Sequence, residues 1–193
     1  MFIGKKTLAI LCLTTALVSI SLNTQAEESV SLEYQVKAAF ILNFAKFVDW
    51  PSQTFSNTQS PVVIGVLGQN PFGGVLEETI QNQTLNSRLF IVKYSPNLQE
   101  LKTCQIIFIS QSEKGSVRDI LSQLRGSSVL TVSDVDNFAE NGGIIHFIRE
   151  ENKVRFEINR EAAEQANLKI SSKLLSLAQI VKPAPESGGG KVN

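Results

Sequence analysis

The feature most suggestive of chemistry is a glycine-rich loop, Gly68–Gly74, which follows an apolar strand and opens a predicted helix. Free backbone N–H groups at such a place can hold an anion. Gly68 and Gly73 have the spacing of the first half of a phosphate-binding P-loop, but Gly74-Val75 stands where that motif requires lysine and then serine or threonine. The loop therefore predicts either a tight turn or a small-ligand pocket. The contacts of such a pocket would come from Gly68, Asn70, Phe72 and Gly73.

Few other side chains could do catalytic or metal chemistry. His146 is the only histidine, and it lies in a predicted strand without the serine, cysteine or carboxylate pattern of a catalytic site. Glu77-Glu78 lies on a predicted helix, and the other pairs of acids lie in loops or turns. Carboxylates at such places are usually solvated. Motifs of serine hydrolases, zinc proteases, thiol oxidoreductases and calcium sites are missing. The sequence therefore predicts a protein that is not an enzyme and has no cofactor or metal.

Composition excludes another class of function. The 193 residues contain 18 basic and 18 acidic side chains, and 42% of the residues are apolar. A duplex-binding protein needs a basic surplus to displace counterions, so balanced charge argues against a nucleic-acid partner. The length suits one domain with a sizeable core.

The first 26 residues have the pattern of a secretory signal peptide. Lys5 and Lys6 precede an apolar stretch, Thr7–Leu22, and Thr24-Gln25-Ala26 then offers small residues at the positions that a signal peptidase reads. The alternative is an uncleaved membrane anchor, for which about 16 apolar residues are short. We predict cleavage after Ala26, which leaves 167 residues with a net charge of −2 (16 basic and 18 acidic side chains).

Cys104 is then the only cysteine of the mature chain, so no internal disulfide can form. It directly precedes an apolar run, Gln105–Ile109, which predicts a buried thiol that packs as a small hydrophobe. A redox role would require exposure and a lowered pKa. The sequence indicates neither.

Helical and extended patterns alternate along the mature chain. The predicted helices cover residues 29–49, 75–81, 114–124, 160–167 and 171–181. The predicted strands cover residues 61–67, 88–94, 105–110 and 128–132, followed by a hairpin of 144–149 and 153–158. This order predicts a single three-layer α/β domain over residues 27–182, with a mostly parallel sheet, an antiparallel C-terminal hairpin and helices on both faces. Residues 183–193 (PAPESGGGKVN) contain no apolar run that could be buried and are predicted to form a disordered tail.

The first and last predicted helices carry more apolar surface than one face of a sheet can cover. In the first, Phe40 and Phe44 form one stripe and Ile41 and Ala45 a second, so the helix must be covered by the core on two sides or by a partner chain, including a second copy. The last is apolar over more than half of its circumference, so it is either packed on the core or offered to a partner. The candidate partner-binding residues are Leu168, Ile170, Leu174 and Leu177.

Sequence motifs along almost the whole mature chain resemble the YfiR-like family. They are YQVKAAFILNFAKFVDWP (34–51), IGVLG (64–68), CQIIFIS (104–110), VLTVS (129–133), FAENGG (138–143), VRFEIN (154–159) and LKISSKLL (168–175). The positions that the resemblance implies to be structural are Trp50, Pro51, Cys104, Gly142, Gly143, Phe156, Asn159, Ser171 and Ser172.

The resemblance implies a periplasmic, non-enzymatic α/β protein. It also implies partners: the periplasmic sensor domain of an inner-membrane diguanylate cyclase, which such a protein represses, and an outer-membrane peptidoglycan-associated lipoprotein, which sequesters the repressor. For the best-known relative, the resemblance also implies a redox-sensitive disulfide between cysteines that flank the Gly-Gly motif. The matching positions here are Glu140 and Phe147, so that bridge cannot form. Two functions remain open: a regulator of this kind, and a small-ligand-binding protein that uses the Gly68–Gly74 loop.

Overall fold

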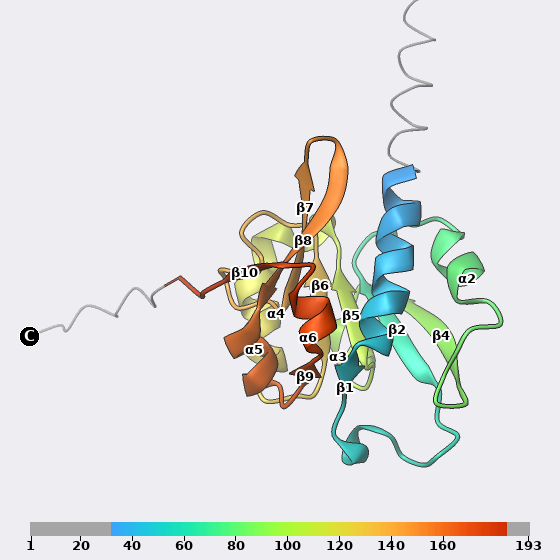
Figure 1. Cartoon of the computed structure of the whole chain (residues 1–193). Helices are drawn as coiled ribbons and strands as arrows, with labels where there is room; N and C mark the ends of the chain where they lie inside the picture. Colours follow the sequence, from blue (N-terminus) through green and yellow to red (C-terminus); the bar gives the residue numbers. More distant parts are fainter. Residues whose placement is uncertain (1–31, 185–193) are drawn as a thin grey trace, which may run out of the picture.

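The computed structural model describes residues 32–184, which form a central sheet covered by helices on both faces (Figure 1). The predicted signal peptide and residues 185–193 of the predicted tail lie outside the described residues. The first helix spans residues 32–46. The other helices are α2 (Val75–Ile80), α3 (Leu98–Leu101), α4 (Val117–Leu124), α5 (Arg160–Gln165) and α6 (Ser172–Leu175), with 3-10 turns at Ser52–Thr54 and Gln111–Ser116.

The main sheet has eight strands in the order β10-β8-β7-β6-β5-β2-β4-β3. Their bounds are β2 (Val62–Leu67), β3 (Thr84–Leu85), β4 (Arg88–Ser95), β5 (Ile106–Ile109), β6 (Leu130–Ser133), β7 (Ile145–Glu150), β8 (Lys153–Asn159) and β10 (Gln179–Val181). The five strands from β4 to β7 in this order are parallel, and β8 turns back against β7 as the predicted hairpin. The predicted fold class, a single α/β domain with a mostly parallel sheet, is confirmed.

Each face of the sheet has its own core. The N-terminal helix, α2, α5 and α6 cover one face, where the Phe44 ring packs 5.6 Å from Phe147 and 5.0 Å from Phe156. Helices α3 and α4 cover the other face, around Ile107 and Phe138. Because both faces are covered, the central strands are continuous apolar runs and do not alternate between apolar and polar residues.

The prediction that the first helix continues to Asp49 is wrong. The helix ends at residue 46, and β1 (Val48–Asp49) pairs antiparallel with β9 (Lys169–Ile170) in a separate two-stranded ribbon. The chain becomes extended ahead of Trp50-Pro51, and the pairing partner comes from a segment more than a hundred residues later. The helical periodicity of residues 29–49 carries no information about so distant a pairing partner.

The predicted final helix over residues 171–181 is also wrong. Only Ser172–Leu175 is helical, and Gln179–Val181 forms β10, which extends the sheet parallel to β8 with Ile180 opposite Ile158. The β-branched pair Ile180-Val181 favours a strand once an edge is available. The outer edge of β8 provides that edge, so tertiary pairing overrides the helical spacing of the leucines.

Candidate partner-binding surface

The structure separates the four predicted partner-binding residues into buried and exposed ones. Leu168 and Leu174 are buried in the core on the face of the N-terminal helix, and Ile170 is half-buried opposite Val48 in the β1–β9 ribbon. Leu177 is 64% exposed, in the turn between α6 and β10. Ile180 of β10, which sequence reasoning did not single out, is also exposed. The exposed large apolar side chains of this segment are therefore Leu177 and Ile180.

The cap and the short length of α6 explain why Leu174 is buried and Leu177 is exposed. The Ser171 side chain caps α6, since its Oγ accepts a hydrogen bond from the Leu174 N–H at 3.2 Å. This cap starts the helix with Leu174 turned into the core. The helix then stops after one turn, so Leu177 lies beyond it and faces solvent.

A buried charge cluster holds the start of the N-terminal helix. The Lys37 Nζ lies 2.6 Å from Asp134 Oδ2 and 2.6 Å from Glu33 Oε1, and the Tyr34 hydroxyl donates to the same Asp134 oxygen at 2.8 Å. Burial, and then the charge of Asp134, raise the pKa of Tyr34 well above its usual value. Sequence reasoning missed this cluster, although Lys37 lies beside Ala38 and one turn before Ile41 on an inward-facing part of the helix.

The Gly68–Gly74 loop is filled by its own side chains. The Asn70 amide donates to the Gly73 carbonyl at 2.8 Å and accepts from the Phe72 N–H at 2.9 Å. The Phe72 ring is buried between Tyr34 and Phe108, at centroid distances of 5.2 and 4.8 Å. The four residues predicted for a ligand pocket are therefore engaged in closing a turn and in the core.

Gly68 shows how tightly this loop packs. It has a φ of +90°, and a Cβ there would lie 2.3 Å from the Ser112 Oγ. Ser112, from the turn after β5, also accepts a hydrogen bond from the Gln69 N–H at 3.0 Å. At the carboxyl ends of β2 and β5, where open α/β sheets often bind ligands, the Gly68 turn is therefore in direct contact with Ser112.

Several family-motif residues hold the turn before β7. A Cβ at Gly143 would lie 2.2 Å from the Phe138 ring, so only glycine fits. The Asn159 amide donates to the Ala139 carbonyl at 2.7 Å, and its oxygen caps α5 by accepting from the Ala162 N–H at 3.0 Å. Asn159 therefore ties β8, α5 and this turn together. Phe156 lies in the core beside Phe44, whereas Trp50 is half-buried next to that core.

His146 and Cys104 have structural surroundings. His146 is buried on β7, and its Nδ1 lies 2.9 Å from the Glu157 carboxylate on the facing residue of β8. Cys104 is buried two residues before β5 begins, and burial raises the pKa of its thiol to about 11. Across residues 32–184, no group of three or more potential metal-ligating His, Cys, Asp or Glu side chains occurs.

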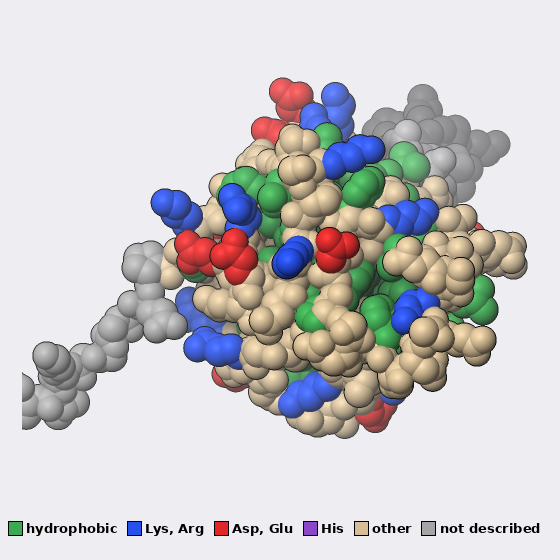
Figure 2. All heavy atoms as spheres, turned by 60° about the horizontal axis from the view of Figure 1, so that its bottom comes forward, with side chains coloured by type: hydrophobic (Ala, Val, Ile, Leu, Met, Phe, Trp, Pro, Cys, Tyr) green, Lys and Arg blue, Asp and Glu red, His purple; other side chains and the backbone are tan. Residues whose placement is uncertain are grey.

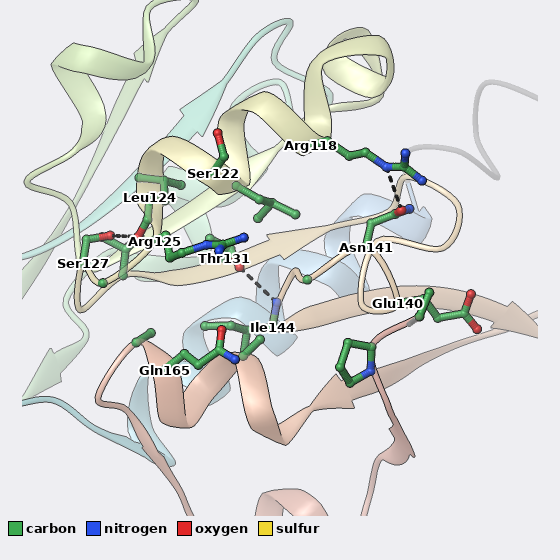
Figure 3. A pocket seen from close by; sticks show the side chains of 18 residues that line it. Arg118, Ser122, Leu124, Arg125, Ser127, Thr131, Glu140, Asn141, Ile144 and Gln165 are labelled. Carbon is green, nitrogen blue, oxygen red and sulfur yellow. Dashed lines mark hydrogen bonds between the residues drawn. The ribbon is translucent and has the colours of Figure 1, made fainter. Parts of the chain in front are cut away.

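A cavity of about 660 Å³ lies between α4, the Glu140–Ile144 turn and α5 (Figure 3). Arg118 Nε donates to Asn141 Oδ1 at 3.3 Å at its rim, and Arg125 and Gln165 lie on opposite sides of it. The chain borders the cavity again at Pro183 and Ala184, where the Ala184 N–H donates to the Glu140 carbonyl at 3.0 Å. On the face shown in Figure 2, basic and acidic side chains are interspersed, with hydrophobic side chains between them.

Comparison with known proteins identifies the family. The model of the YfiR/HmsC-like family matches residues 34–179, which is most of the chain. This chain belongs to the YfiR/HmsC-like family. Membership supports, at the level of the family, a periplasmic regulator of cyclic di-GMP signalling.

Two further comparisons add little to the YfiR/HmsC-like assignment. A search of curated proteins gives no match. Among solved structures, the crystal structure of a conserved domain protein from Vibrio cholerae O1 biovar eltor is similar, with 12% identity and a TM-score of 0.47. The match covers 63% of this chain and 55% of that chain. No helix within residues 32–184 combines the length and apolar character needed to cross a membrane.

Proposed function

We propose that this protein is a periplasmic, non-enzymatic regulator that binds the periplasmic sensor domain of an inner-membrane diguanylate cyclase and represses cyclic di-GMP synthesis. The observation that carries the proposal is the family match over residues 34–179. The predicted signal peptide, cleaved after Ala26, would deliver the chain to the periplasm.

Repression of this kind is a population shift. A ligand changes the balance between the on and off states of the cyclase only through a difference in its affinity for the two. Moving the cyclase from almost fully active to almost fully inactive requires about 10⁴-fold tighter binding to the off state. An outer-membrane peptidoglycan-associated lipoprotein that sequesters the regulator would lower its free concentration and release the cyclase.

We propose that the cyclase contacts the surface formed by Leu177 and Ile180. Both side chains are exposed in a chain segment whose neighbours are packed on the core. Exposed apolar residues beside a rigid scaffold are the usual anchors of a protein interface. The alternative is that the same residues form a homodimer, which size-exclusion chromatography would detect.

The test is affinity capture of the tagged mature chain with detergent-solubilised membranes of the native host, followed by mass spectrometry. Three forms are compared: wild type, Leu177→Lys, and the control Gln123→Lys, which adds the same charge at an exposed position of α4. We expect wild type and the control to retain a diguanylate cyclase and Leu177→Lys to lose it, with unchanged thermal unfolding. Size-exclusion chromatography of the same samples reports a dimer.

Two outcomes would contradict the proposal. If wild type enriches no diguanylate cyclase over a tag-only sample, the proposed function is wrong. If Leu177→Lys retains the cyclase as well as wild type, the function stands and the proposed surface is wrong.

A further inference from the structure

The outer edge of β4 is open along most of its length. β3 pairs only with Arg88 and Leu89, whereas β4 continues to Ser95. The Gly68 N–H donates to the Ser95 carbonyl at 3.2 Å, so the backbone N–H and C=O of Ser95 point toward β2. The backbone groups of successive residues point alternately to the two sides of a strand. Those of Val92 and Tyr94 therefore point away from β2, toward the open edge. Within residues 32–184 no strand pairs with β4 there.

A groove of about 530 Å³ lies beside this edge, between β4 and the end of α2. It is lined by Glu77, Glu78, Ile80, Gln81, Asn82, Gln83 and Leu89–Val92. Figure 1 shows α2 and the loop that follows it next to β4, at the side of the molecule away from α5. A strand edge beside a helix is a geometry into which an extended peptide adds as a further strand, with alternate side chains in the groove.

This edge is only weakly protected. Leu89 is 61% and Ile91 45% exposed, whereas natural sheets protect open edges with charges, prolines or short strands. The one charged residue on the open part of β4 is Lys93, whose ammonium group donates to the Glu100 carbonyl at 2.8 Å. The opposite edge of the sheet has such protection, since β10 has three residues and is followed by Lys182-Pro183.

The charge of the groove selects a type of occupant. Glu77 and Glu78 stand on its helical wall, and neither forms a salt bridge with any residue in the described range 32–184. An incoming strand with lysine or arginine beside its apolar residues would complement both carboxylates. The groove itself is otherwise lined by apolar and amide side chains.

A second copy of this chain fits the edge poorly. An antiparallel β4–β4 pair centred on Val92 would place Ser95 of one copy opposite Leu89 of the other, where Thr84 of β3 already pairs. A pair centred on Lys93 avoids Leu89 but places the Lys93 residues of the two copies directly opposite each other, and like charges at that position are destabilising. A short strand from a different protein meets neither obstacle, so we take it as the occupant.

We infer that the β4 edge and the groove beside α2 form a second protein-binding site, which accepts an extended segment of another protein as an added strand. Its apolar side chains enter the groove and its basic side chains lie opposite Glu77 and Glu78. The site is on the opposite edge of the sheet from Leu177 and Ile180, and the inference does not depend on which protein binds there.

The test is selection of short random peptides displayed on phage against the immobilised mature chain. We expect enriched peptides that alternate apolar and basic residues. Their binding should weaken at least about tenfold on Ile91→Lys, which places a charge at the edge. It should weaken about threefold on Glu78→Gln, as for one exposed ion pair. The matched control, Val36→Lys, places the same charge at a similarly exposed β-branched residue on the N-terminal helix (38% exposed, against 45% for Ile91) and should leave binding unchanged.

Amide exchange measured by NMR separates strand addition from other binding. The bound peptide should slow exchange of the outward Val92 and Tyr94 amides, while the Ile91 and Lys93 amides, which face β2, stay as slow as before. Thermal unfolding of each variant verifies the fold. The inference is overturned if no peptide is enriched, if Ile91→Lys binds the peptides as tightly as wild type, if protection appears away from β4, or if the edge instead mediates a dimer that Ile91→Lys abolishes.

Discussion

Replacing Lys37 by methionine is the sharpest test of what positions the N-terminal helix. The side chains of Lys37 and Asp134 are 5% and 8% exposed, and their charged atoms lie 2.6 Å apart. In the variant, Asp134 keeps the hydrogen bond from the Tyr34 hydroxyl but loses its cation. Its other oxygen, Oδ1, is buried without a hydrogen-bond partner among the described residues. The carboxylate would therefore be left almost uncompensated in a buried place.

The size of the effect can be bounded. Removing one partner of a buried ion pair usually costs about 3–5 kcal/mol. Protonating an ordinary aspartate at pH 7 costs about 4 kcal/mol, and the folded variant can always take up that proton, so the charge-burial cost cannot exceed this value. We expect Lys37→Met to lower the free energy of unfolding by about 3–4 kcal/mol at pH 7. At pH 5 protonation is easier, and the same cost is at most about 1.5 kcal/mol.

The assay is urea unfolding of the mature chain followed by circular dichroism at both pH values. Lys46→Met on the exposed side of the same helix is the control, expected to change stability by less than about 0.5 kcal/mol. Adding Asp134→Asn to Lys37→Met should recover at least half of the loss, because the uncompensated charge is removed. A loss below about 1 kcal/mol for Lys37→Met, as for an exposed pair, would refute the reasoning.

Two further predictions concern the core. Gly143→Ala should destabilise the fold by about 1–3 kcal/mol through overpacking against the Phe138 ring, while Gly115→Ala, where an added Cβ meets nothing within 4 Å, should change the urea midpoint little. Equal midpoints for the two variants would contradict this. Because burial raises the pKa of Cys104 to about 11, a water-soluble disulfide reagent should label it at pH 8 only after urea unfolding. The free energy of unfolding should also decline as the pH rises above about 9, because the thiol ionises in the unfolded chain before it ionises in the folded one. Rapid labelling of the folded chain would contradict the labelling prediction, because it would show that the thiol is accessible.

The central part of the fold was predictable because its signal is local. The apolar runs ending at Leu67 and Ile109 are strands covered on both faces, and such strands show as continuous hydrophobic segments in any sequence. The hairpin of β7 and β8 alternates visibly, and Asn159 has the position and side chain of a helix cap. In each case the sequence within a few residues specifies the element.

The chain ends were mispredicted because their structure depends on distant pairing. Val48 lies opposite Ile170, and Ile180 lies opposite Ile158. Segments of two or three residues carry too little pattern to separate a strand from the end of a helix, and the partner strand decides. The same holds for the buried cluster, where Lys37 and Asp134 meet although 97 residues separate them in the sequence. A lysine on an inward-facing part of a helix was the available signal, since a buried charge requires a partner.

The turn before β7 is held without a covalent bond. Glu140 and Phe147 stand at the two positions where the family resemblance implies cysteines. The Asn159 amide holds the Ala139 carbonyl, and the Gly143 N–H donates to the Phe138 carbonyl at 2.9 Å. Phe147 itself packs on Phe44 in the core. These contacts contain no group that an oxidant or reductant changes at mild potential, so regulation of this protein through the turn would have to act on packing and on bound partners rather than on a disulfide.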